Sequence, residues 1–182
     1  MKCIKNYILR FLSRENGVVA VEMAIILPIL LLIYMAVYEI TMLYTLSKRL
    51  TRFASHMGDM VAQETSINKQ YLQGFENFLR ATMYPYRTPN HSIIVTGYWL
   101  DNKQIVRKMW NWSSSNVKVE REDIPASIKD ASTFIVRAEV SINYRTLVFS
   151  KILPDSLKGD IVLRKVYYYR QRLGDQIVCR DC

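Results

Sequence analysis

The chain has few of the residues on which most catalytic centres depend. Its 182 residues include only two histidines, His56 and His91, and three cysteines. It has no glycine-rich phosphate-binding loop and no G-x-S-x-G nucleophile turn. Glu122 and Asp123 stand in a polar stretch that is typical of solvated surface. We therefore expect that the protein is not an enzyme and has no cofactor, no metal site and no small-molecule substrate.

Acidic residues are in the minority. The sequence has 25 Lys and Arg against 16 Asp and Glu, which gives a formal net charge of +9. A basic surface favours acidic partners such as lipid head groups, polysaccharide or nucleic acid. A solvated surface that is merely basic is the simpler interpretation, and nucleic acid is not the partner that we expect.

Charge is almost absent from one long stretch near the N-terminus. Val18–Tyr38 is a run of 21 residues in which Glu22 is the only charged one. As a helix this run would span about 32 Å, which is close to the thickness of a bilayer core. It is too long for the apolar core of a signal peptide, and no small-x-small cleavage pattern follows it. We therefore predict a transmembrane helix over residues 18–40.

The flanking charges predict the orientation of this helix. Residues 1–17 form a basic leader with a net charge of +3, and positive flanks stay in the cytoplasm. Lys48, Arg49 and Arg52 on the far side weaken the prediction, although they lie about ten residues beyond the apolar run. We expect a single-pass protein with a cytoplasmic N-terminus and an exported C-terminal part.

Cysteine usage agrees with an exported C-terminal part. Cys179 and Cys182 form the pair CRDC, which can be a disulfide, a redox centre or half of a zinc site. A redox motif needs a following helix, for which the sequence gives no signal, and zinc would have to recruit the distant His56 and His91. A structural disulfide, worth about 2 kcal/mol, fits an oxidising compartment best.

Apolar residues continue beyond the membrane segment at helical spacings of three and four. They form a helix-packing seam: Leu43, Leu46, Leu50, Phe53, Met57 and Met60. No strong helix breaker follows before Gln63, so we predict one helix from about Val18 to about Glu64, about 70 Å long. Residues 41–66 would be an extracytoplasmic stalk. Pro28 removes one backbone hydrogen bond and should kink the membrane half.

Residues 67–182 are predicted to form a small α+β head. Ile67–Met83 has the pattern of a helix that Pro85 ends. The residues expected to be buried on this helix are Tyr71, Phe75, Phe78 and Leu79. The stretches HSIIVTGYWL and QIVRKMWNW flank Asp101–Lys103 and predict a β-hairpin.

Two further strands complete the predicted antiparallel sheet. Thr133–Arg145 alternates apolar and polar residues, which predicts one buried face and one mostly polar face. Ile161–Arg170 is the last strand, and Glu120–Asp130 is a polar connection with room for a short helix. The strand aromatics could stack on bases or sugars, although sheet packing is the commoner role: Trp99, Trp110, Trp112 and Tyr167–Tyr169.

Glu22 is the unusual residue of the membrane segment. A carboxylate in hydrocarbon costs about 2.5–3.5 kcal/mol at mid-membrane and less near the edge, so a cation should meet it. If the bond after Gly17 were cut, Val18 would carry a new amino group on the same helix face as Glu22. A neighbouring molecule could supply the same cation, and the pair would then set the stagger between subunits. Taken alone, Glu22 could also be an edge glutamate that reaches the head groups of an ordinary signal anchor.

The N-terminal string as a whole resembles the TadE-like family, minor pseudopilins of the tight-adherence (Flp) pilus within the type IV prepilin class. The resemblance covers about thirty residues, from Phe11 to Ile40. Its matching features are a leader arginine, a glycine, Ala-Val-Glu, a proline in the apolar run and a glutamate at the membrane end: Arg14, Gly17, Ala20–Glu22, Pro28 and Glu39. Met23 departs from the family pattern, which usually has phenylalanine there.

This resemblance implies a pilin-like lollipop in the inner membrane, with its head in the periplasm or carried on an extracellular pilus. It implies cleavage between Gly17 and Val18 by a prepilin peptidase, and an assembly contact through Glu22. Other pilins and pseudopilins, including a TadF-like protein, are the implied partners. The alternative is a signal-anchored binding protein whose basic, aromatic sheet recognises polysaccharide or nucleic acid.

Overall fold

A computed structural model describes residues 15–86, 90–102, 105–115, 124–125, 128, 132–146 and 160–182, with side chains from residue 18 onward. The predicted leader up to residue 14 and most of the polar connection Glu120–Asp130 lie outside the described residues. The chain divides into two compact units, Met1–Met42 and Leu43–Cys182. The residues predicted as a stalk are thus, from Leu43 onward, part of the same unit as the sheet.

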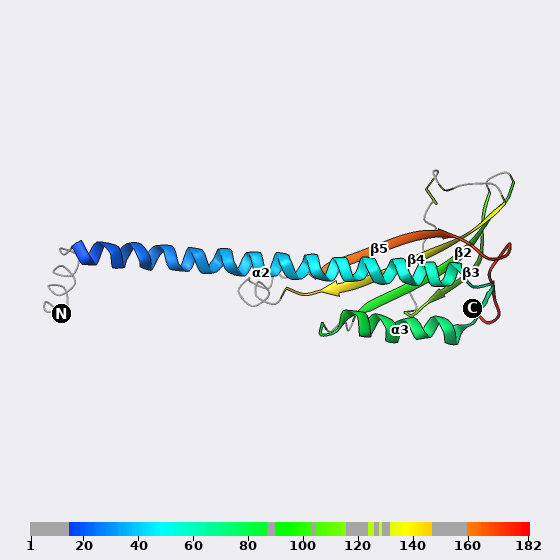
Figure 1. The fold of residues 1–182 in the computed structure, drawn as a ribbon, viewed down its shortest axis with the longest axis horizontal. Coiled ribbons are helices and arrows are strands. Elements are labelled where there is room, and N and C mark those ends of the chain that lie inside the picture. Colours follow the sequence, from blue (N-terminus) through cyan, green and yellow to red (C-terminus); the bar gives the residue numbers. More distant parts are fainter. Residues whose placement is uncertain are drawn as a thin grey trace. The chain divides into compact units, whose positions relative to one another are not determined.

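The first long element is helix α2, which runs without interruption from Glu15 to Ala62 (Figure 1). The predicted helix is confirmed, although it begins three residues earlier and ends two residues earlier than expected. Pro28 lies inside it, and the kink predicted there stays a prediction. Within the described residues, α2 is the one helix long and apolar enough to cross a membrane. Its apolar side chains from Val18 to Ile40 are mostly exposed in the isolated chain, as a lipid-facing segment requires.

The second unit contains an antiparallel sheet of four strands in the order β3-β2-β4-β5 (Figure 1). The strands are β2 (His91–Leu100), β3 (Val106–Ser113), β4 (Thr133–Tyr144) and β5 (Ile161–Arg170). The predicted hairpin and the two later strands are therefore present, and the fold class is α+β. A separate two-stranded parallel sheet joins β1 (Ser66–Ile67) to β6 (Val178–Cys179).

The sheet packs against the C-terminal part of α2 and against α3 (Lys69–Met83) on one face, because side chains from all three share one core cluster. In β4 that face consists of alternate residues, as the sequence predicted: Phe134, Val136, Ala138, Val140 and Ile142. Asn68 caps α3 with its side-chain oxygen, which accepts a hydrogen bond from the Tyr71 amide at 2.8 Å.

The buried face of α3 differs from the prediction by part of a turn. Phe75 and Leu79 are buried as expected, but Leu72 and Met83 complete the face. Tyr71 is only half-buried, and Phe78 is exposed although its ring contacts that of Phe53 at a centroid distance of 5.3 Å. The spacing of apolar residues is compatible with the predicted face and with the observed one. The packing of the helix against the sheet determines which of the two is buried.

The second face of β4 is mostly polar, as predicted, but the prediction contrasted it with the buried face, and part of it is buried as well. Ile135, Arg137 and Glu139 on this face are all buried, with Arg137 only 1% exposed. Arg137 and Glu139 form an ion pair, which lets two charged residues occupy a buried face together. Nearer one end, Ile135 belongs to a second small apolar cluster with Tyr98, Leu100 and Ile124.

Candidate functional site

The predicted cleavage and assembly residues all lie on α2. Gly17 and Val18 lie in its first described turn, so the peptide bond between them is part of the helix. Val18 and Glu22 are both exposed and, four residues apart, share one face of the helix. Among the residues that the structure describes, no lysine or arginine forms an ion pair with Glu22, whereas Glu39 at the other end of the apolar run is buried.

The helix-packing seam lies inside the second unit. Leu46, Leu50, Phe53 and Met57 are each at most 2% exposed and belong to the main core cluster. Leu43, at the start of the seam, is half-buried, and Met60, at its end, is 44% exposed. The middle of the seam is therefore occupied by the chain's own sheet and second helix, and it offers no free apolar surface to another subunit.

Arg49 fastens α2 to the end of α3. Its Nη1 donates hydrogen bonds to the carbonyl oxygens of Thr82 at 3.2 Å and Tyr84 at 2.5 Å. Its guanidinium also lies over the ring of Tyr86, 5.3 Å from the centroid. This arginine, considered in the sequence only as a positive charge beyond the apolar run, thus has a structural role.

The comparison with known families concerns this same helix. Residues 17–58 match the family model of TadE-like proteins. The resemblance drawn from the sequence is thereby confirmed over a segment that begins at the predicted cleavage site and ends at Gly58 in the packed part of α2. No curated protein and no solved structure gives a significant match to the chain.

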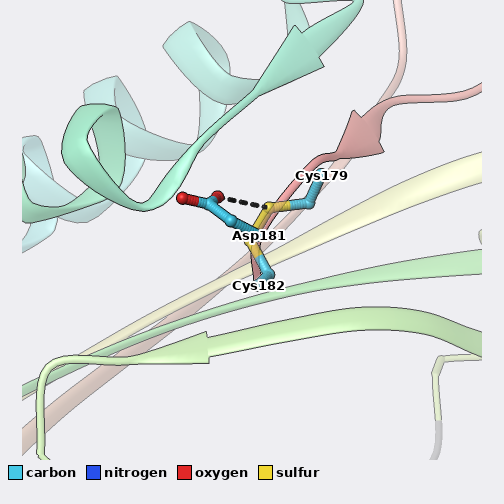
Figure 2. Close-up of side chains that lie close together, drawn as sticks. All are labelled: Cys179, Asp181 and Cys182. Atoms are coloured by element: carbon cyan, nitrogen blue, oxygen red, sulfur yellow. Dashed lines mark hydrogen bonds between the residues drawn. A yellow bond between two sulfur atoms is a disulfide. The ribbon is translucent and has the colours of Figure 1, made fainter.

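The C-terminal residues of the chain bind to the junction between α2 and α3. Cys179 and Cys182 are joined by a disulfide with a Cα–Cα distance of 5.7 Å. Figure 2 shows this disulfide with the carboxylate of Asp181 beside it. The Oδ1 atom of Asp181 accepts a hydrogen bond from the Lys69 amide at the start of α3, at 2.7 Å. The amides of Val178 and Arg180 bond to the carbonyls of Thr65 and Ile67. We call residues Val178–Cys182 the C-terminal clasp.

Within the described part of the chain, the clasp also holds a group of three side chains of metal-ligating type. The donor atoms of Cys179, Asp181 and Cys182 lie within 4.8 Å of one another. Both sulfur atoms are bonded to each other, and a disulfide sulfur is not the thiolate that zinc requires. Neither His56 nor His91 belongs to this group. The arrangement is that of a structural disulfide.

The strand aromatics serve the core. Trp110 and Trp112 are buried, and the indole Nε1 of Trp110 donates a hydrogen bond to the Ile177 carbonyl at 2.8 Å. Trp99, Tyr167 and Tyr169 are half-buried against the same cluster. Packing, the commoner of the two roles considered for these residues, is the one observed, so these rings do not form an open stacking platform.

A charged cluster on the second face of the sheet was not predicted from the sequence. Glu139 is 7% exposed and accepts a hydrogen bond from Arg164 Nε at 2.5 Å in addition to its ion pair with Arg137. On β4, Arg137 and Glu139 are two residues apart, and Arg164 comes from β5 beside them. Only the cross-strand register brings Arg164 to Glu139, so no local sequence signal could have identified the cluster.

Proposed function

We propose that this protein is a minor pseudopilin required for assembly of an adhesive Tad (Flp) pilus, processed by a prepilin peptidase between Gly17 and Val18. The family match supports the coarser statement, that it is a pilin-like protein associated with a Tad pilus. The observation that carries the finer proposal is the spacing of Val18 and Glu22 on one exposed face of an apolar helix.

Cleavage would change the charge balance at the edge of the membrane segment. A free Val18 amine has an ordinary pKa of about 7.7–8.0 and is mostly protonated at neutral pH. It would place a cation one helical turn from the Glu22 carboxylate, or offer that cation to Glu22 of a neighbouring subunit. A carboxylate that is costly in hydrocarbon would then be paired within the assembly, and the pair would set the axial stagger of adjacent helices.

The proposed topology has the N-terminus in the cytoplasm and the second unit in the periplasm or on the pilus. The net charge of +3 over residues 1–17 supports this orientation. The disulfide of the C-terminal clasp supports it independently, because disulfides persist in oxidising compartments. Its proposed partners are the peptidase, other pilins and pseudopilins including a TadF-like protein, and the assembly machinery.

The alternative is a signal-anchored binding protein for polysaccharide or nucleic acid. The basic net charge favours this alternative. The burial of Trp110 and Trp112 argues against it, because buried rings cannot stack on a ligand. The two proposals differ in the covalent structure of the mature protein, because only a pilin loses its leader.

The decisive experiment is N-terminal sequencing of the protein purified from membranes of cells that produce it, with and without the peptidase. We expect the mature chain to begin at Val18 when the peptidase is present, about 2 kDa lighter than the precursor, since 17 residues are removed. A chain that still begins at Met1, or that begins at any residue other than Val18, contradicts the proposal.

A further inference from the structure

The exposed face of α2 in the second unit carries a regular stripe of side chains. Its members follow one another at spacings of four residues: Tyr44, Lys48, Arg52, His56 and Met60. Residues at this spacing are neighbours on a helix surface. All five are exposed, at 62% for Tyr44 and 44% for Met60 at the two ends. We call these five residues the α2 stripe.

The charges of the α2 stripe are all of one sign. Between Leu43 and Gly58 the sequence has three basic residues, one histidine and no acidic residue. Lys48 lies over the ring of Tyr44, 5.3 Å from its centroid. In the part of the chain that the structure describes, neither Lys48 nor Arg52 forms an ion pair with a carboxylate.

The exposed face of α3 is an ordinary solvated helix surface, and its composition differs from that of the α2 stripe. Its exposed residues include neutral amides, Gln70, Gln73 and Asn77, and its arginine Arg80 is paired with Glu76 at 4.0 Å. Mixed charge of this kind is what solubility alone requires. The α2 stripe instead has cations in the middle and a large aromatic or thioether side chain at each end. Tyr, Met and Arg are the residue types enriched at protein interfaces.

We propose that the α2 stripe is the docking surface for an acidic helix of a second membrane protein in the same assembly. This rests on the proposed pseudopilin function, which it deepens by naming the chemistry of the partner. Lys48, Arg52 and His56 form a line about 12 Å long, at about 1.5 Å per residue, and the first two are cations. A partner helix that lies parallel to α2 and has Asp or Glu at every fourth position would place one carboxylate opposite each of these side chains. Tyr44 and Met60 supply apolar contacts that exclude water at the ends of the line.

Site-specific photo-crosslinking in membranes of cells that assemble the pilus tests this proposal. A photo-reactive amino acid replaces Met60, which leaves all the cations in place, and the same probe replaces Gln73 on α3 as a control. The proposal predicts a protein crosslink from position 60 to a helix rich in Asp and Glu, and none to that helix from position 73. Mass spectrometry of the crosslinked peptide identifies the segment.

Charge reversal makes the test specific. The double variant Lys48→Glu/Arg52→Glu should lower the crosslink yield from position 60 roughly tenfold, because two attractive contacts become repulsive. Lys69→Glu/Arg80→Glu on α3 makes the same change in net charge and should leave the yield unchanged. Replacing the partner's acidic residues with lysine should restore the yield with the Lys48→Glu/Arg52→Glu chain.

Three results would overturn the proposal: a crosslink insensitive to Lys48→Glu/Arg52→Glu, a crosslink only to lipid or to a second copy of this chain, or no crosslink at all. Failure of docking is distinguishable from failure of the proposed function. If wild-type cells form pili and the mature chain begins at Val18, but one of these three results is obtained, the pseudopilin function holds and the docking surface is wrong. A precursor that keeps its leader in wild-type cells contradicts the function itself.

Discussion

The ring of Tyr169 occupies the space that a side chain on Gly58 would need. A Cβ atom at position 58 would stand 2.5 Å from Cδ2 of Tyr169, closer than two such atoms approach in proteins. Three residues earlier on α2, the hydroxyl groups of Ser55 and Tyr169 share a hydrogen bond of 2.7 Å. Helix α2 and strand β5 therefore meet at a point where the helix carries no side chain and the strand carries a large one.

This contact predicts opposite effects of the same substitution at two glycines. Gly58→Ala should lower the free energy of unfolding by about 1–3 kcal/mol, because the ring of Tyr169 must move in a packed core. Gly74→Ala on α3, where an added Cβ meets nothing within 4 Å, should raise it by about 0.5–1 kcal/mol through helix propensity. Urea unfolding of the full chain in detergent, followed by tryptophan fluorescence, measures both. Equal effects at the two positions would contradict the close contact.

Glu139 should be far more important for stability than its partner Arg164. Glu139→Gln removes the charge that neutralises the buried Arg137 and should destabilise the fold by about 3–5 kcal/mol. The side chain of Arg164 is 46% exposed, so Arg164→Gln should cost about 1 kcal/mol or less. The same unfolding assay separates the two variants. A mild effect of Glu139→Gln would mean that solvent reaches the pair.

The C-terminal clasp should protect the start of α3. Cys182→Ser removes the disulfide and should lower the free energy of unfolding by about 2 kcal/mol. Asp181→Ala, which leaves the disulfide intact, should cost about 1 kcal/mol by removing the acceptor for the Lys69 amide. In Cys182→Ser, hydrogen exchange should become faster at the amides of Lys69, Val178 and Arg180. In Asp181→Ala, it should become faster at the Lys69 amide only. Unchanged exchange at Lys69 in both would contradict the capping role.

Tyr71 predicts a loss of stability at alkaline pH. Burial raises the pKa of its phenol above the ordinary value of 10.0, and the nearby charge of Glu64 raises it further. The folded state therefore holds this proton more tightly than the unfolded state does. The resulting contribution of Tyr71 to the free energy of unfolding is complete below about pH 10 and is lost as the pH rises above that value. Tyr71→Phe cannot ionise, so its stability should fall less steeply over the same range. Identical slopes for the variant and the wild type would show that Tyr71 contributes nothing.

Glu22 should be needed for assembly but not for cleavage. Glu22→Ala leaves Gly17 and Val18 unchanged, so the mature chain should still begin at Val18. Without a carboxylate to pair with the new amine, pilus assembly or association with partner pilins should be abolished. Met23→Leu, next in the sequence and neutral in both forms, is the control and should assemble normally. Pilus counts by electron microscopy and N-terminal sequencing give the two readouts, and normal pili in Glu22→Ala would rule out the charge pairing.

Much of the fold could be predicted because its signals are local. The apolar period of α2, the alternation of β4 and the bounds of β5 all depend on neighbours in the sequence, and each was recovered to within a few residues. The spacing of Gly17, Val18 and Glu22 is equally local, and the family match covers the same part of the chain. Local periodicity failed at α3, where the apolar pattern fits two faces and the buried one includes Met83 rather than Phe78.

By itself the sequence determined that this protein has a long apolar helix with one carboxylate near its start, followed by an antiparallel sheet. Only the tertiary structure decided that the seam of α2 is buried in its own core, that Glu139 joins two arginines, and that the C-terminal clasp caps α3. The reason is that the contacts that complete these arrangements join residues distant in the chain: Arg164 is 25 positions from Glu139, and Lys69 is 112 positions from Asp181. The periodicity of apolar residues specifies which face of a helix or strand is buried. Strand register and helix docking determine which residues cover that face.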